Sequence, residues 1–227
     1  MADEHTFHSH RRPIQSRQQP WARSIAARLA RLGLSPNQIS ALSLVFAALA
    51  GGCAALLALV THPGGRAALM LGAALCIQLR LLCNLFDGMV AIEGGRGTPA
   101  GAVWNDLPDR LADPLILVSA GYAITAVAWG AELGWLAGLI AMLTAYIRVL
   151  GGSLGLAQDY SGPMAKQQRM AVLSLAWLAS IAELAFGGRG LALIIALLLI
   201  VVGSGVTAIR RTRRIVAALD KVRDDQP

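Results

Sequence analysis

The chain has 227 residues, of which 56% are hydrophobic and 15% are charged, and its mean hydropathy is +0.57. Soluble domains are about one quarter charged, so this composition excludes an ordinary water-soluble globule. The formal net charge is +7, which in a soluble protein would favour nucleic acid as a partner. Here the basic residues cluster outside the apolar stretches, and no nucleic-acid motif accompanies them. We therefore expect membrane lipids with anionic headgroups as partners, and no nucleic acid.

The N-terminal region is first polar and then amphipathic. Residues 1–14 are polar and are predicted to be a disordered tail. Residues 15–34 place apolar side chains at helical spacing between arginines, which is typical of a basic helix that lies in the headgroup plane of a membrane. A helix start follows, with Ser35 as the N-cap and Pro36 at the first helical position.

Six apolar stretches follow, and each is long enough to cross a bilayer as a helix. They lie near residues 38–61, 68–93, 98–128, 132–156, 167–187 and 189–210. The predicted fold is an all-α integral membrane protein, in which the amphipathic interfacial helix precedes six transmembrane helices within residues 35–210. Residues 211–227 are predicted to form a basic cytoplasmic tail.

The distribution of Lys and Arg predicts the orientation in the membrane. Six spans place both termini on the same side. Of the 20 basic residues, only Arg66 and Arg189 fall on the opposite side. Because short basic loops stay in the cytoplasm, we expect both termini on the cytoplasmic face of the inner membrane.

Four aspartates interrupt the second and third apolar stretches, where an ionised group costs at least a few kcal/mol. They are Asp87, Asp106, Asp109 and Asp113, and Asn84 and Asn105 lie nearby. Helical periodicity places the last three aspartates within about 60° of arc on one helix. Consecutive spans joined by a tight turn are expected to be antiparallel neighbours, so the two polar stripes would face each other near the cytoplasmic ends.

A cluster of oxygen ligands of this kind suits one or two Mg²⁺ or Mn²⁺ ions, and such ions can clamp a diphosphate. The alternative is that Arg80 and Arg110 neutralise the acids. Two arginines cannot balance four aspartates, so we favour the metal site. Three small residues, Gly88, Ala91 and Gly101, leave room for a bulky ligand at the helix surfaces.

The segment 84–109 resembles the signature of the CDP-alcohol phosphotransferase family, D-x2-D-G-x2-A-R-x8-G-x3-D-x3-D. The spacing agrees throughout, and the predicted six spans with an amphipathic N-terminal helix are also similar to that family. Three positions depart from it: Asn84 and Asn105 replace the first and third aspartates, and Ile92 replaces the arginine. An asparagine keeps one carbonyl oxygen for a metal but loses the charge, which Asp106 and Asp113 could restore.

The resemblance implies an enzyme, a divalent-metal-dependent CDP-alcohol phosphatidyltransferase that acts as a homodimer. It would transfer a phosphatidyl-type group from CDP-diacylglycerol to a small alcohol acceptor and release CMP in phospholipid biosynthesis, with Asp109 as the base that activates the acceptor hydroxyl. The candidate ligands of Mg²⁺ or Mn²⁺ are Asn84, Asp87, Asn105, Asp106, Asp109 and Asp113. The candidate CDP-binding residues are Asn84, Gly88, Ala91 and Gly101.

A second basic cluster consists of Arg148, Lys166 and Arg169. In the resembled family, basic residues in this region line the pocket for the acceptor, which is often phosphorylated. Lys166 and Arg169 lie at the start of the fifth span, where the helix dipole favours an anion. We therefore expect these residues to bind an acceptor phosphate, such as that of glycerol 3-phosphate or an inositol phosphate. The alternative is that they are ordinary basic anchors at the membrane surface.

Two other functions remain open. The two asparagines favour a non-catalytic family member that binds lipid or nucleotide. A cation-coupled small transporter would use the intramembrane acids, although the chain shows no convincing internal repeat. Glu183 stands alone among apolar residues. It would lie near the outer interface, pair with Arg189 or be protonated, and we assign it no role.

Overall fold

The computed structural model describes residues 19–93, 100–187 and 189–224, and all regular secondary structure in these residues is helical. The helices are α2 (Pro20–Arg31), α3 (Pro36–Leu56), α4 (Pro63–Glu93), α5 (Gly101–Tyr122), α6 (Gly130–Ser153), α7 (Lys166–Glu183) and α8 (Leu191–Asp224), and the short 3-10 helix η2 (Leu184–Phe186) follows α7. The tail at residues 1–14, which the sequence predicts to be disordered, lies outside the described residues.

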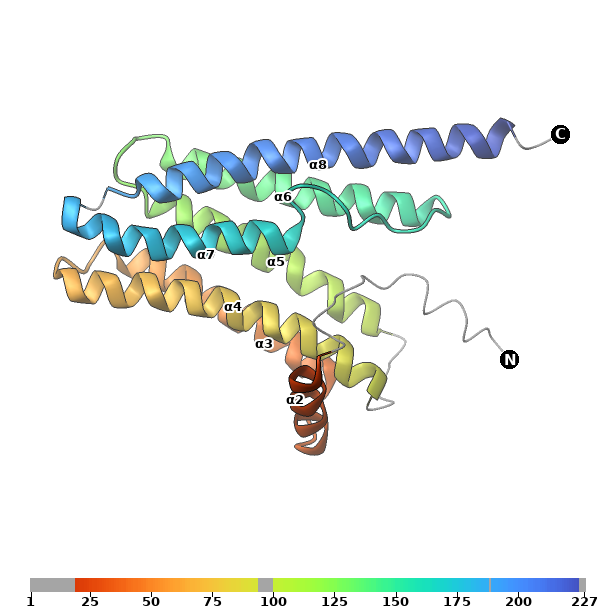
Figure 1. The fold of residues 1–227 in the computed structure, drawn as a ribbon, viewed down its shortest axis with the longest axis horizontal. Helices are drawn as coiled ribbons and strands as arrows, with labels where there is room; N and C mark the ends of the chain where they lie inside the picture. The colour runs from red at the N-terminus through yellow and green to blue at the C-terminus, as the bar shows by residue number, and fades with distance from the viewer. Residues whose placement is uncertain (1–18, 94–99, 188, 225–227) are drawn as a thin grey trace.

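Helices α3 to α8 run along a common direction, and α2 crosses them (Figure 1). Five of these six helices, α3, α4, α6, α7 and α8, are long and apolar enough to cross a membrane. Helix α5 runs along the same bundle but carries four charged residues, Asp106, Asp109, Arg110 and Asp113. The described part of the chain is therefore an all-helical membrane protein with five candidate spans.

The six long helices form a closed ring. Neighbours in the ring are α3 and α4, α4 and α7, α7 and α8, α8 and α6, α6 and α5, and α5 and α3. Helices α4 and α5 are consecutive in the chain but make few direct contacts, so the expectation that they pack as neighbours is wrong. The physical reason is that α3 packs against both of them.

The ring encloses an apolar core in the half that lies toward the α3–α4, α5–α6 and α7–α8 turns (Figure 1). Its largest buried side chains include Ile77, Leu117, Leu173, Trp177 and Leu197. Burying each such side chain contributes about 1.5–3 kcal/mol relative to water. The other half of the ring contains the buried charged side chains Arg80, Asp87, Asp113 and Arg169.

The two N-terminal helices follow the local sequence pattern. Helix α2 buries Ala22 and Ala26 against α4 around Phe86, while its arginines are exposed. A capping box begins α3: Ser35 Oγ accepts a hydrogen bond from the backbone N–H of Gln38 at 3.2 Å, and Gln38 Oε1 accepts one from the Ser35 N–H at 2.9 Å. The N-cap predicted at Ser35 is confirmed.

Glu183 has a role that the sequence does not reveal. Its carboxylate accepts hydrogen bonds from the backbone N–H groups of Gly190 at 3.1 Å, Leu191 at 3.1 Å and Ala192 at 2.5 Å. These are donors at the beginning of α8, which have no partner within that helix. Glu183 therefore caps α8 from the end of α7 and holds the two helices together at this turn.

Glycines bring α5 and α6 into close contact. An added Cβ at Gly134 would lie 2.9 Å from the Cα of Gly121 and 2.9 Å from the carbonyl oxygen of Leu117. An added Cβ at Gly121 would lie 2.6 Å from the carbonyl oxygen of Gly130. These are backbone atoms, which cannot move away individually, so the α5–α6 contact depends on glycine at these positions.

We expect Gly134→Ala to lower the free energy of unfolding by about 1–3 kcal/mol, because the added methyl group forces α5 and α6 apart. Thermal unfolding in detergent measures the loss. The control is Gly52→Ala in α3, where an added Cβ meets nothing within 4 Å. Equal melting temperatures for the two variants would contradict the proposed role of Gly134.

We expect Glu183→Ala to destabilise the protein by about 0.5–2 kcal/mol, because three backbone donors at the beginning of α8, two of them in part-buried hydrogen bonds, lose their acceptor. Glu183→Gln keeps one acceptor oxygen and should cost less. If Glu183 acted mainly through an ion pair with Arg189, then Arg189→Gln would cost as much as Glu183→Ala. We expect Arg189→Gln to leave the melting temperature nearly unchanged.

Candidate active site

Charged side chains gather in the half of the ring beyond the apolar core. They come from four helices: Arg80 and Asp87 from α4, Asp106, Asp109, Arg110 and Asp113 from α5, Arg148 from α6, and Lys166 and Arg169 from α7. Removing a charge from water costs several kcal/mol unless another charge compensates it. The pairing of these side chains therefore decides what the site can bind.

Arg80 links α4 to α5 at the centre of this cluster. Its side chain is 0% exposed, and its Nη2 lies 2.9 Å from Asp109 Oδ1 and 2.6 Å from Asp113 Oδ1. Asn84, one turn further along α4, donates from Nδ2 to the same oxygen of Asp109 at 2.9 Å. The two polar stripes therefore face each other, as the sequence predicts, although their helices barely touch.

Helix α7 adds two basic side chains to the same aspartates. Lys166 Nζ pairs with Asp109 Oδ2, and Arg169 Nη2 lies 3.2 Å from Asp113 Oδ2. Arg169 is buried, and its Nη1 also donates to Thr144 Oγ1 of α6 at 3.1 Å. Asp109 and Asp113 thus each contact two basic residues, and three helices meet at these carboxylates.

Asp106 forms the outer edge of the cluster. Its Oδ1 lies 2.9 Å from Arg110 Nη2 and 2.5 Å from Arg148 Nη2, and the Asp106 side chain is 37% exposed. Arg148 Nη1 also donates to Gln158 Oε1 at 2.5 Å and to the hydroxyl of Tyr160 at 3.2 Å. These contacts tie α5 and α6 to the segment that precedes α7.

Asp87 differs from the other three aspartates. It is only 3% exposed, and it accepts hydrogen bonds from Ser40 Oγ at 2.8 Å and from the backbone N–H of Gly88 at 2.5 Å. Among the described residues it forms no ion pair. Asn105, the other asparagine of the signature, is exposed on α5. Three candidate CDP-binding residues lie half-buried near the adjoining ends of α4 and α5: Gly88, Ala91 and Gly101.

The view that only Arg80 and Arg110 are available to neutralise the four aspartates is wrong. Asp106, Asp109 and Asp113 are met by Arg80, Arg110, Arg148, Lys166 and Arg169. Arg80 and Arg110 lie on the same helices as the acids, so the sequence pattern reveals them. The other three basic residues lie on α6 and α7, and ring closure brings them to α5.

Asp87 and Asn84 carry the oxygens that remain for a metal ion. In the part of the chain that the structure describes, no three His, Cys, Asp or Glu side chains are grouped as metal ligands. However, Asp87 is buried and forms no ion pair with a described basic side chain, and carboxylate and amide oxygens are the ligands that Mg²⁺ and Mn²⁺ prefer. This donor set therefore fits a hard divalent cation.

The last turns of α8 hold the segment 154–165 that leads into α7. The predicted sixth span ends at residue 210, but the helix continues, and the buried Arg211 donates to the carbonyl oxygens of Ser161 at 3.0 Å and Thr144 at 2.8 Å. Arg214 Nη1 lies 2.8 Å from Asp159 Oδ2. Burial alone would raise the pKa of Asp159, but hydrogen bonds from Ser161 and Arg214 outweigh it and lower this pKa.

Sequence reasoning missed Arg211, because hydropathy shows where a helix leaves the apolar region and not where the helix ends. The available signal was that the helical pattern of α8 continues past residue 210, with Arg211 as its next residue. Arg211 supports the site indirectly, because Thr144, whose carbonyl oxygen it binds, also accepts a hydrogen bond from Arg169, and because Ser161 lies in the segment that leads into α7.

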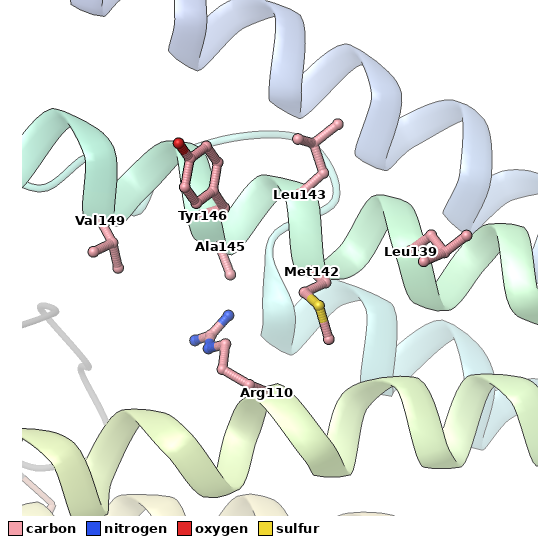
Figure 2. Close-up of a pocket in the computed structure, with 7 residues that line it drawn as sticks. All are labelled: Arg110, Leu139, Met142, Leu143, Ala145, Tyr146 and Val149. Carbon is pink, nitrogen blue, oxygen red and sulfur yellow. The ribbon is translucent and has the colours of Figure 1, made fainter.

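An apolar pocket of about 450 Å³ lies between α5 and α6, next to the charged cluster. Figure 2 shows Arg110 of α5 pointing toward α6, which supplies the remaining lining residues: Leu139, Met142, Leu143, Ala145, Tyr146 and Val149. Most of these α6 side chains are exposed. The pocket therefore belongs to the outer surface of the ring, and Arg110 connects it to Asp106.

Comparison with known proteins confirms the resemblance to the CDP-alcohol phosphotransferases. No family model matches the sequence. A relative is phosphatidylinositol phosphate synthase of Mycolicibacterium smegmatis, which is 27% identical over 205 residues, or 86% of this chain and 83% of that protein.

Crystal structures of Mycobacterium tuberculosis phosphatidylinositol phosphate synthase share this fold. The complex with manganese and citrate has a TM-score of 0.68 and 23% sequence identity, over 86% of this chain and 88% of that one. The structure with CDP-DAG bound has a TM-score of 0.65 and 25% identity, over 86% of this chain and 92% of that one.

We expect Asp113→Asn to lower the melting temperature strongly, because Arg80 and Arg169 would keep buried charges without this carboxylate. Breaking a buried ion pair costs about 3–5 kcal/mol. Asp106→Asn removes more exposed pairs, which contribute about 0–1 kcal/mol, and serves as the control. Unfolding is measured with a chelator present. A loss for Asp113→Asn that occurs only when metal is added would show that Asp113 acts as a metal ligand instead.

Proposed function

We propose that this protein transfers the phosphatidyl group of CDP-diacylglycerol to a small alcohol and releases CMP, as a step of phospholipid biosynthesis. The observation that carries the proposal is the meeting of the two halves of the signature: Asn84 of α4 and Asp109 of α5 lie 2.9 Å apart, inside a ring of apolar helices. The relatedness to phosphatidylinositol phosphate synthases supports it.

The proposed membrane arrangement includes α5 as the sixth span and α2 as an interfacial helix. Helix α5 occupies a place in the ring between α3 and α6, and its aspartates are paired, which offsets the cost of placing them among apolar helices. The exposed arginines of α2 suit anionic headgroups. We place both termini and the charged cluster on the cytoplasmic side of the inner membrane, residues 15–34 at the interface and residues 35–210 in the transmembrane domain. Residues 211–227 form the basic tail, whose first turns belong to α8.

Asp109 is the proposed base. Arg80 and Lys166 pair with its carboxylate and fix its position. In the reaction Asp109 accepts the proton of the acceptor hydroxyl while the hydroxyl oxygen forms a bond to the β-phosphorus of the CDP-lipid. The bond from that phosphorus to the CMP oxygen breaks, and CMP leaves with the electron pair.

Basic residues orient the phosphates. Lys166 and Arg148 have side chains that are 16% and 12% exposed, so they can reach a ligand, and we assign them to the acceptor phosphate. Arg169, the third candidate, is buried between Asp113 and Thr144, and it positions α7 so that Lys166 faces Asp109. The name of the relatives favours an inositol phosphate as the acceptor over glycerol 3-phosphate.

A divalent cation, Mg²⁺ or Mn²⁺, would be held by Asp87 with Asn84, and when bound it supplies positive charge to the diphosphate. Asn84, Gly88, Ala91 and Gly101 are the proposed contacts of CDP at the ends of α4 and α5. The homodimer implied by the resemblance stays a prediction, which the mass of the protein in lipid nanodiscs would test.

CMP release from CDP-diacylglycerol tests the proposal. Purified protein with Mg²⁺ or Mn²⁺ is expected to release CMP only when the correct acceptor is added from a panel that includes an inositol phosphate and glycerol 3-phosphate. Asp109→Asn should lower the rate by about 10²-fold or more. The control is Glu132→Gln, at the start of α6 in the opposite half of the ring.

Two outcomes would contradict the proposal. Metal-dependent CDP binding without CMP release for any acceptor, while a related synthase is active in the same assay, would indicate a non-catalytic binding protein. Absence of any metal-dependent CDP binding would favour the transporter alternative.

A further inference from the structure

Arg80 lies one helical turn before Asn84, a position at which the family signature has an aspartate. The signature provides aspartates at the positions of Asn84 and Asn105, and Arg80 precedes Asn84 by one helical turn on the same face of α4. In the structure, Arg80 Nη2 and Asn84 Nδ2 both lie 2.9 Å from Asp109 Oδ1. The chain has therefore lost two carboxylates and holds a guanidinium beside the remaining signature aspartate of α5.

Asp109 has one acceptor site left on its carboxylate, so it cannot bridge two metal ions while it keeps its three partners. Its Oδ1 accepts from Arg80 and Asn84, and its Oδ2 pairs with Lys166. Two adjacent divalent cations need anionic oxygens that they share. A second ion next to Asp109 would also lie beside a guanidinium and an ammonium group, whose positive charges repel it.

Asp87 differs from Asp109 in the partners of its carboxylate. It is 97% buried, contacts only Ser40 and the Gly88 N–H among its hydrogen-bond donors, and forms no ion pair with any described residue. A buried carboxylate is costly without a positive charge nearby. A cation bound at Asp87 would offset this cost.

The charges of the inner cluster agree with one ion. Three basic residues, Arg80, Lys166 and Arg169, stand with three acidic ones, Asp87, Asp109 and Asp113, and their formal charges cancel. A diphosphate that links a nucleoside to a lipid carries two negative charges at neutral pH. Before the acceptor binds, one divalent cation then restores neutrality inside the ring, whereas two would leave an excess of two positive charges.

We infer that Arg80 takes the place of one divalent cation and that the site binds a single Mn²⁺ or Mg²⁺ ion, at Asp87. This inference rests on the proposed function for the presence of the diphosphate. Arg80 is a positioning residue, because its fully buried side chain acts on the substrate through Asp109. Its Nε and Nη1 have no hydrogen-bond partner among the described residues, so its two carboxylates hold it in place.

The number of bound Mn²⁺ ions tests the inference directly. The full-length protein in detergent with CDP is expected to bind one Mn²⁺ per chain by elemental analysis and titration calorimetry, with the electron paramagnetic resonance spectrum of an isolated ion. Asp87→Asn should weaken this binding by at least 10-fold, and Glu132→Gln should not change it. Two ions per chain, a spin-coupled pair or no bound Mn²⁺ would overturn the inference.

A reconstructed signature provides a second test. The variant Asn84→Asp/Asn105→Asp retains Arg80 and is expected to bind one Mn²⁺ still, whereas addition of Arg80→Met should allow a second ion and the signal of a coupled pair. One ion in a correctly folded triple variant would contradict the role of Arg80. If the triple variant does not fold, the number of Mn²⁺ ions bound by the wild type and the effect of Asp87→Asn still decide whether the site holds a single ion at Asp87.

The outcomes separate this inference from the proposed function. One bound Mn²⁺ without CMP release for any acceptor would leave the single-ion site standing and remove the transferase. Two bound ions with acceptor-dependent CMP release would leave the transferase standing and remove the substitution of a metal ion by Arg80.

Discussion

The ion pairs between Arg80 and the carboxylates of Asp109 and Asp113 are the contacts on which the interior of this protein depends. Helices α4 and α5 make few other contacts with each other, and the guanidinium that joins them is fully buried. Separating a buried pair leaves an uncompensated charge, which costs several kcal/mol. The relative positions of α4 and α5 therefore depend on these ion pairs together with α3, which lies between the two helices in the ring and packs against both.

The same constraint extends to the C-terminal half of the chain. Helix α7 reaches the aspartates through Lys166 and Arg169, and the beginning of α7 is held by the segment that Arg211 of α8 contacts through the Ser161 carbonyl. A chain of polar contacts thus runs from the last turns of α8 to Asp109. The chemistry proposed for Asp109 depends on a helix that a hydropathy profile would assign to a tail.

The departures from the family signature are easier to understand together than one by one. Taken alone, Asn84 and Asn105 describe a site that has lost charge. In the structure the loss is accompanied by the buried Arg80. The formal charges of the inner cluster cancel without a metal ion, although Asp87 forms no ion pair among the described residues. A site built in this way needs less divalent charge to accept a diphosphate.

The sequence by itself determined what local patterns encode: the helical class, the N-cap at Ser35, the amphipathic helix around Ala26, and the spacing that brings the signature residues to one face of each helix. Periodicity, capping and hydropathy depend on residues a few positions apart, so they can be predicted from the sequence. Only the tertiary structure decided that α3 separates α4 from α5, that Glu183 caps α8, and which basic side chain meets each aspartate. Those contacts join residues that are far apart in the chain, or that face each other across a turn, and they exist only once the ring of helices has closed.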